Sequence, residues 1–360
     1  MEANYILATL LEPDWLLTLT QAQWGQLIRQ GKWTGLLARL HAIIEERGLL
    51  SEIPGRARAH LIAARTVADS QGQVLRWEVN RIERAFKDAA LPFLLLKGAA
   101  YILLDLPFAR GRVSSDVDIL VAKDRLIEAE RCLIDWGWAA TKLEEYDQYF
   151  YRAYSHELPP LRHRERGTIV DVHHTILPPT GRLHPDPVKL MTGAVQIPGT
   201  NLSVLAPTDM VLHSAAHAFQ DGDLKAPLRD LVDLDGLFRH FGTELRFWQQ
   251  LLPRASELQL SRPLYYALRY TKHVLNTPIP EEILDDSQKS QPPWPALRIM
   301  DQLVANVVRP RPRSGEGFAG GFSAGLLYAR SHWLRMPPWL LTRHLLRKSL
   351  RLGFRQDRKS

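Results

Sequence analysis

The pattern of apolar and polar positions changes twice along this 360-residue chain. Residues 1 to about 90 show helical spacing throughout, and residues 56–89 predict one long amphipathic helix. Pro92 marks the change to a middle region in which short apolar runs alternate with helical patterns. From Pro207 onward the helical spacing returns, in segments 208–220, 228–241, 243–252 and 262–275.

This pattern predicts an α/β (α+β) fold. We expect a sheet with helices on one side, flanked by helical N- and C-terminal regions. The expected strands are 93–96, 116–121, 149–154 and 168–173, and residues 201–205 could add an edge strand. The expected regions are a helical N-terminal region (1–90), a core (91–206), a helical C-terminal region (207–308) and a basic tail (309–360).

Two aspartates on one expected strand are the most informative chemical feature. Asp116 and Asp118 are two residues apart and therefore project from the same face, while the apolar residues between and after them point into a core. Adjacent carboxylates repel each other, and a bound divalent cation is the usual means of offsetting that repulsion. A third strand aspartate, Asp171, could complete the cluster, with His173 on the same face of its strand.

Residues suited to hold phosphate groups precede these acids. Lys97 and Gly98 stand where a strand passes into a helix, and the first amides of a helix form an anion site. Gly98 allows close approach of the backbone. Arg110 and Arg112 lie on the following loop and offer forked guanidinium groups. Ser115 could bond phosphate or cap the turn into the strand.

These residue types fit nucleotidyl transfer. That reaction uses two cations about 3.5–4 Å apart, one on the attacking hydroxyl and one on the triphosphate. Magnesium takes oxygen ligands, and Mn²⁺ is a possible substitute. Asp116 and Asp118 would bridge both ions, and Asp171 would hold the ion on the nucleophile side or accept the hydroxyl proton.

The run from Leu94 to Val121, followed by Asp171-Val172-His173, resembles the polymerase-beta-like nucleotidyltransferase superfamily. It resembles in particular an uncharacterised bacterial branch whose motif reads Leu-Lys-Gly, an arginine-bearing loop and Asp-x-Asp. Segments 212–217 and 228–233 resemble the helical C-terminal region of that branch. The resemblance implies a mixed sheet with flanking helices, magnesium, and transfer of a nucleoside monophosphate from an NTP with release of pyrophosphate. One departure is Gly98-Ala99, where the wider superfamily has Gly-Ser.

Two other interpretations stay open. The chain could be a catalytically inactive module that binds a nucleotide or a partner of a biosynthetic assembly. His213 and His217, spaced i and i+4, could be zinc ligands, could pack against Arg229, Asp230 or Asp233, or could line an acceptor pocket. A hydrolase or kinase is disfavoured, because its signature motifs are absent. The acceptor, whether small molecule, sugar, peptide or RNA end, is undetermined.

The distribution of charge along the chain indicates which binding partners the protein could have. The chain carries a net charge of +7, but residues 309–360 carry ten Arg and two Lys against one Glu and one Asp, so the rest is net negative. The basic amphipathic stretch 339–352 suits packing on the protein itself, a partner protein or an anionic membrane surface, and nucleic acid less well. A single cysteine and the lack of a long apolar run predict a cytoplasmic protein, with peripheral membrane contact as an option.

Overall fold

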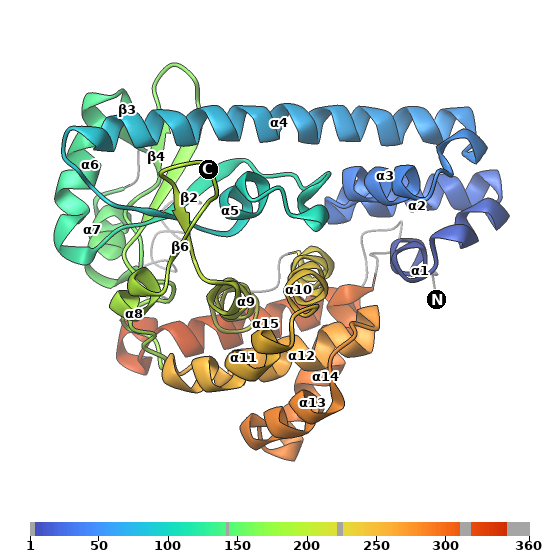
Figure 1. Cartoon of the computed structure of the whole chain (residues 1–360). Helices are drawn as coiled ribbons and strands as arrows, with labels where there is room; N and C mark the ends of the chain where they lie inside the picture. Colours follow the sequence, from blue (N-terminus) through green and yellow to red (C-terminus); the bar gives the residue numbers. More distant parts are fainter. Residues whose placement is uncertain (1–3, 142–143, 222–225, 310–317, 344–360) are drawn as a thin grey trace, which may run out of the picture.

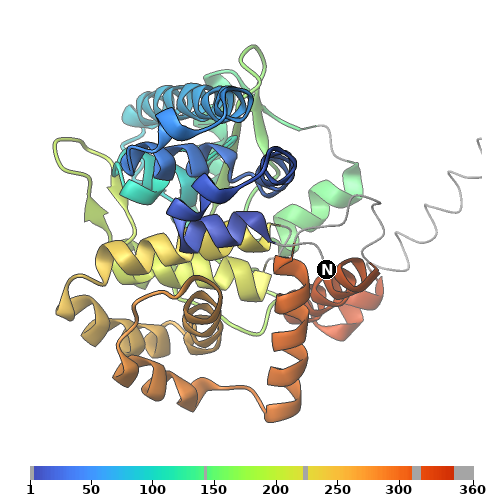
Figure 2. The same cartoon turned by 90° about the vertical axis from the view of Figure 1, so that its right-hand side faces the viewer.

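The computed structural model describes residues 4–141, 144–221, 226–309 and 318–343 (Figures 1 and 2). Most of the basic amphipathic stretch, from residue 344, lies outside the described residues. The prediction for that stretch therefore remains a prediction.

The helical N-terminal region and the helical return after Pro207 are confirmed. α2 begins with a capping box, because Thr20 and Gln23 bond each other's backbone amides, and it ends at Gly35 in the left-handed conformation. The helices are α1 (Tyr5–Leu11), α2 (Gln21–Thr34), α3 (Leu37–Glu46), α4 (Gly55–Lys87), α5 (Lys97–Leu103), α6 (Leu126–Asp135), α7 (Glu145–Tyr154), α8 (Pro187–Thr192), α9 (Pro207–Ala216), α10 (Pro227–Phe241), α11 (Leu245–Glu257), α12 (Ser261–Leu275), α13 (Glu281–Ser287), α14 (Trp294–Val308) and α15 (Phe318–Arg335).

The middle region forms one mixed sheet in the order β3-β4-β5-β2-β1-β7-β6. Its centre is the parallel pair β2 and β5, and β1 runs antiparallel to β2 on the other side. The strands are β1 (Leu94–Leu95), β2 (Asp116–Leu120), β3 (Trp138–Ala140), β4 (Leu161–His163), β5 (Ile169–His173), β6 (Val195–Gln196) and β7 (Ser203–Val204).

Helices cover both sides of this sheet, not one side as expected. Figure 1 shows α4 running along one side and α8, α9 and α10 on the other. Val117 and Ile119 of β2 are buried, and α4 packs on this strand. Asp116 and Asp118 alternate with these residues and therefore face the side of α9 and α10. The buried apolar residues from α1 to α15 form one continuous core.

The loop from Asp105 to Ser115 is clamped between the two helical regions. Arg39 of α3 donates a hydrogen bond to the carbonyl of Pro107, 3.0 Å away. On the other side Phe108 fills the space above Gly236 of α10, where a Cβ would collide with its ring. The loop that leads into β2 therefore has a fixed position.

One strand prediction is wrong, and another is wrong only in the position of the strand within the sheet. Residues 149–154 belong to helix α7, in which Tyr146, Phe150 and Tyr154 lie on one face with neighbouring ring centroids 6.2 and 5.5 Å apart. Aromatic residues favour strands when they pack against neighbouring residues of a sheet. Here they contact one another along a helix. The strand at 203–204 is not at the edge, because β6 pairs with it from outside.

None of the helices among the described residues combines the length and apolar character needed to cross a bilayer.

Candidate active site

The three aspartates predicted from the sequence, called the acid triad below (Asp116, Asp118 and Asp171), lie on adjacent strands. Asp118 of β2 and Asp171 of β5 are direct partners in the parallel register. Neighbouring strands are about 4.8 Å apart, so these two side chains leave the sheet side by side. Asp116 stands one pleat away on the same face. The register thus gathers the acid triad on the face that looks toward α9 and α10.

Asp118 is held by two basic groups. Its Oδ1 lies 3.5 Å from Nζ of Lys97 and 3.0 Å from Nε2 of His173. Burial opposes ionisation of this carboxyl, but Lys97 and His173 outweigh it and hold the pKa of Asp118 well below its usual range. The same carboxylate is the main neighbour that raises the pKa of Lys97 against the effect of burial. Asp118 is therefore ionised.

The basic groups near the other two acids are outweighed by burial and by neighbouring carboxylates. Burial and the charge of Asp118 raise the pKa of Asp116, and burial with Glu157 and Asp118 raises that of Asp171 to about 7. Oδ1 of Asp171 is buried and has no hydrogen-bond partner among the described residues. A carboxylate oxygen in this situation fits a divalent cation, which would offset the crowded negative charge.

Gly98 lies beneath side chains of the loop that leads into β2. A Cβ at this position would collide with the guanidinium of Arg112 and the hydroxyl of Ser114. The space above the Lys97-Gly98 turn is therefore filled by this chain's own donors. Lys97 begins α5 with a φ of +42°, a conformation that costs a non-glycine residue about 1 kcal/mol.

Arg112 lies inside the protein and is tied to α10. Its side chain is only 14% exposed, its Nε donates to Oδ2 of Asp233 at 3.0 Å, and its guanidinium lies 5.5 Å from the ring centre of Tyr101. Asp233 raises the pKa of Arg112 although burial opposes it. Arg112 is thus a permanent positive charge directly above Gly98.

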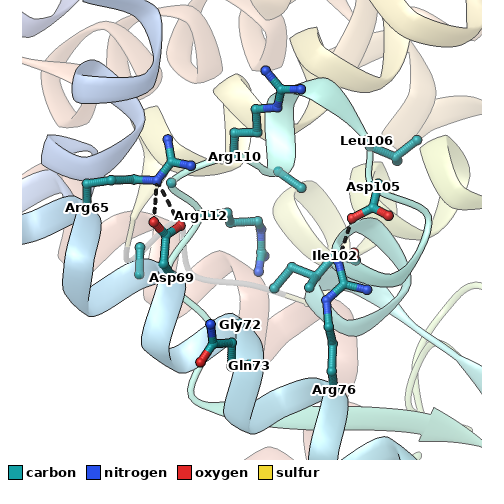
Figure 3. A pocket seen from close by; sticks show the side chains of 13 residues that line it. Arg65, Asp69, Gly72, Gln73, Arg76, Ile102, Asp105, Leu106, Arg110 and Arg112 are labelled. Atoms are coloured by element: carbon teal, nitrogen blue, oxygen red, sulfur yellow. Dashed lines mark hydrogen bonds and ion pairs between the residues drawn. The ribbon is translucent and has the colours of Figure 1, made fainter. Parts of the chain in front are cut away.

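Arg110 is not part of this arrangement. Its side chain is 63% exposed and pairs with Glu46 of α3 at 3.6 Å. It borders a pocket of about 450 Å³ between α4 and the loop, which Arg112 also lines. Figure 3 shows this pocket ringed by Arg65, Arg76, Arg110 and Arg112. Ser115 is exposed just before β2, whereas its neighbour Ser114 is the serine beside Gly98.

We expect Arg112→Gln to cost about 3–5 kcal/mol of unfolding free energy, because it leaves the buried Asp233 carboxylate without its partner. Arg110→Gln is the matched control and should change stability by less than about 1 kcal/mol, since its ion pair is at the surface. Urea denaturation of both variants checks this. Equal losses in the two variants would contradict the structural difference between these arginines.

His213 and His217 lie near the acid triad. His213 is 2% exposed, and α9 gives way after Ala216 to a π-helical turn that starts at His217. Burial and then Lys97 hold the pKa of His213 well below its usual range, and Lys97 followed by burial lowers that of His217 to about 3. Both are neutral imidazoles near Lys97 and Asp118. Turns of this kind are frequent at functional sites.

Several residues at the site were not singled out from the sequence. Glu157 faces His173 across an isolated antiparallel bridge, and their side-chain atoms are 3.5 Å apart. His156 lies 3.8 Å from Asp221. His156 and Glu157 occur outside any strongly patterned segment, and only the pairing with β5 brings them to the site. A histidine-glutamate pair in a loop carries no local signal.

The pH dependence of stability tests the burial of Asp230 in α10. Burial, opposed by Arg229 and aided by Asp233, raises the pKa of Asp230 to about 7. An acid whose pKa is higher folded than unfolded loses stability as the pH rises between the two values, by up to about 1.4 kcal/mol per pH unit. We therefore expect Asp230→Asn to be more stable than the parent at pH 8 and equal to it near pH 4. Denaturation at both pH values measures this, and a pH-independent difference would refute it.

The sheet and its acidic face are typical of one class of enzymes. A mixed sheet with Asp-x-Asp on one strand, a third aspartate on the parallel neighbour and a Lys-Gly turn opening a helix alongside is the arrangement expected of nucleotidyltransferases. The chain belongs to a family of uncharacterised nucleotidyltransferases, whose family model matches residues 20–276. The family resemblance inferred from the sequence is thereby confirmed. No curated protein and no solved structure matches the chain.

Proposed function

We propose that this protein transfers a nucleoside monophosphate from an NTP to an acceptor and releases pyrophosphate, with the acid triad holding the divalent cations. The observation that carries the proposal is the register of β2 and β5, which sets Asp118 and Asp171 side by side with Asp116 on the same face. Asp171 adds a buried oxygen without a hydrogen-bond partner among the described residues. Bound Mg²⁺ would neutralise phosphate charge and activate the acceptor hydroxyl.

The residues around the acid triad have separate tasks in this proposal. Lys97 and Arg112 supply positive charge for the triphosphate from either side of Gly98, and Ser114 adds a hydroxyl. His173 orients Asp118 through the 3.0 Å contact. Asp171 would hold the ion on the nucleophile side or accept the proton of the acceptor hydroxyl. Gly98 leaves room for Arg112, while Arg110 and Ser115, both exposed, could contact only the outer part of the nucleotide.

In this proposal the acceptor binds on the side of the acid triad that α9 and α10 cover. His213 and His217 are neutral there and could donate or accept a hydrogen bond from an acceptor. This suits a small molecule, a sugar or a peptide segment. The basic tail would provide contact with a membrane surface or a partner protein.

The experiment is a titration of the full chain with each of the four NTPs, in the presence and absence of Mg²⁺, followed by a pyrophosphate-release assay with candidate acceptors. We expect Mg²⁺-dependent binding and release. Failure to bind any NTP would refute the proposal. Binding without release across all acceptor classes would instead favour the inactive binding module.

A further inference from the structure

In the described part of the chain, three side chains bring metal-ligating atoms within 4.8 Å of one another. They are His156, Glu157 and His173. His173 Nε2 and Glu157 Oε2 are 3.5 Å apart, and the rings of His156 and His173 are 5.2 Å apart. The group borders the acid triad through His173 but contains none of its members. It is therefore a distinct set of ligands.

The backbone fixes this group in place. The amide of Leu158 donates to the carbonyl of Val172, and the amide of His174 donates to the carbonyl of His156, both at 2.9 Å. Glu157 and His173 are direct partners in the resulting antiparallel bridge. Residues 156–158 thus run alongside the end of β5, and the site needs little reorganisation of the main chain.

The two imidazoles show what the group lacks. Nδ1 of His156 and Nδ1 of His173 are buried and have no hydrogen-bond partner among the described residues. His173 as a whole is only 1% exposed. Buried polar atoms are normally satisfied. Nε2 of His156 lies 3.8 Å from Oδ2 of Asp221. Nε2 of His173 lies close to two carboxylates, 3.0 Å from Oδ1 of Asp118 and 3.5 Å from Oε2 of Glu157.

We propose that His156, Glu157 and His173 form a binding site for a divalent transition-metal ion, with Zn²⁺ as the best match. Imidazole ligands favour zinc and similar ions, whereas magnesium prefers sites made of oxygen atoms alone. Two histidines and one glutamate also leave a fourth position of a tetrahedral ion open. The ligand atoms of such an ion are about 3.4 Å apart, so side-chain shifts of about 1 Å complete the site.

This site goes beyond the proposed function, because its ligands are distinct from the acid triad. An ion there would lie next to Asp118, since His173 contacts both groups. The test therefore measures metal binding directly and needs no nucleotide.

The full chain, freed of metal with a chelator, is titrated with Zn²⁺ by calorimetry and with Co²⁺ by visible absorption. We expect one tight equivalent, cobalt bands typical of nitrogen ligands and little competition from millimolar Mg²⁺. His156→Ala and Glu157→Gln should each weaken Zn²⁺ binding at least about 100-fold. His174→Ala is the matched control, because its ring is turned to the carbonyl of Ser155 and should not contribute.

Thermal unfolding of each variant shows whether it folds, and Glu157→Gln keeps the shape of the side chain. Unchanged Zn²⁺ affinity in a folded His156→Ala or Glu157→Gln protein would overturn the site. Loss of the tight equivalent in Asp171→Asn but not in these variants would place the ion at the acid triad and would also overturn it. Tight zinc binding in a protein that binds no NTP would leave this site intact while refuting the proposed function.

Discussion

Asp118→Asn should reduce nucleotidyl transfer and Mg²⁺-dependent NTP binding at least about 100-fold while the protein stays folded. Asp118 is the central acid of the triad, since it is the register partner of Asp171 and lies one pleat from Asp116. The amide has nearly the same shape but no charge, so it cannot hold a cation. The charge of Lys97 is still balanced by the carboxylates of Glu157, Asp221 and Asp116 when that of Asp118 is removed. We therefore expect the fold to persist.

The measurement combines calorimetry with a non-hydrolysable Mg²⁺·NTP analogue and pyrophosphate release. Asp124→Asn is the control, because this aspartate follows the same strand but is exposed. The control should behave like the parent protein. Normal turnover in folded Asp118→Asn would remove Asp118 from the proposed site.

Gly111→Ala should cost about 3–5 kcal/mol of stability and should weaken NTP binding as well. Gly111 has a φ of +76°, and an added Cβ would run into the backbone carbonyl of Ala38 in α3, with the amide nitrogen of Arg39 only 2.7 Å away. Backbone atoms cannot move aside as a flexible side chain can. The loop must therefore lift off α3 and take Arg112 with it.

Gly48→Ala separates the two causes of this loss. Gly48 has a similar φ of +69°, but nothing lies within 4 Å of the added Cβ. It should cost only the backbone strain, about 1 kcal/mol, and should leave NTP affinity unchanged. Chemical denaturation and nucleotide titration of both variants provide the comparison. Similar losses in the two proteins would show that contact with α3 does not position the loop.

Local periodicity in the sequence was enough to predict the N- and C-terminal helical regions and the shared face of Asp116 and Asp118. Asp116 and Asp118 are two residues apart on a strand, and Asp171 stands in a second apolar run, so an alternating pattern alone puts each on one face of its strand. The pairing of β2 with β5 could not be deduced in this way. The sequence offered Asp171 as a third member of the cluster, and the strand register sets it beside Asp118.

Contacts between distant segments decided the positions of the individual donors. Arg110 and Arg112 are equivalent in the sequence, but one pairs with exposed Glu46 and the other with buried Asp233, 121 residues further on. Gly98 also looked like a point of backbone approach to phosphate. Only the packing of the loop shows that Arg112 and Ser114 occupy that space.

The nucleotidyltransferase family could be inferred from the sequence, because acidic residues at strand spacing and a Lys-Gly turn are local features. Which charges meet became visible only in the folded chain: Lys97 and His173 lie on Asp118, and Glu157 lies opposite His173. Strand register and helix packing join residues that are dozens of positions apart. No periodicity within one segment encodes those distances.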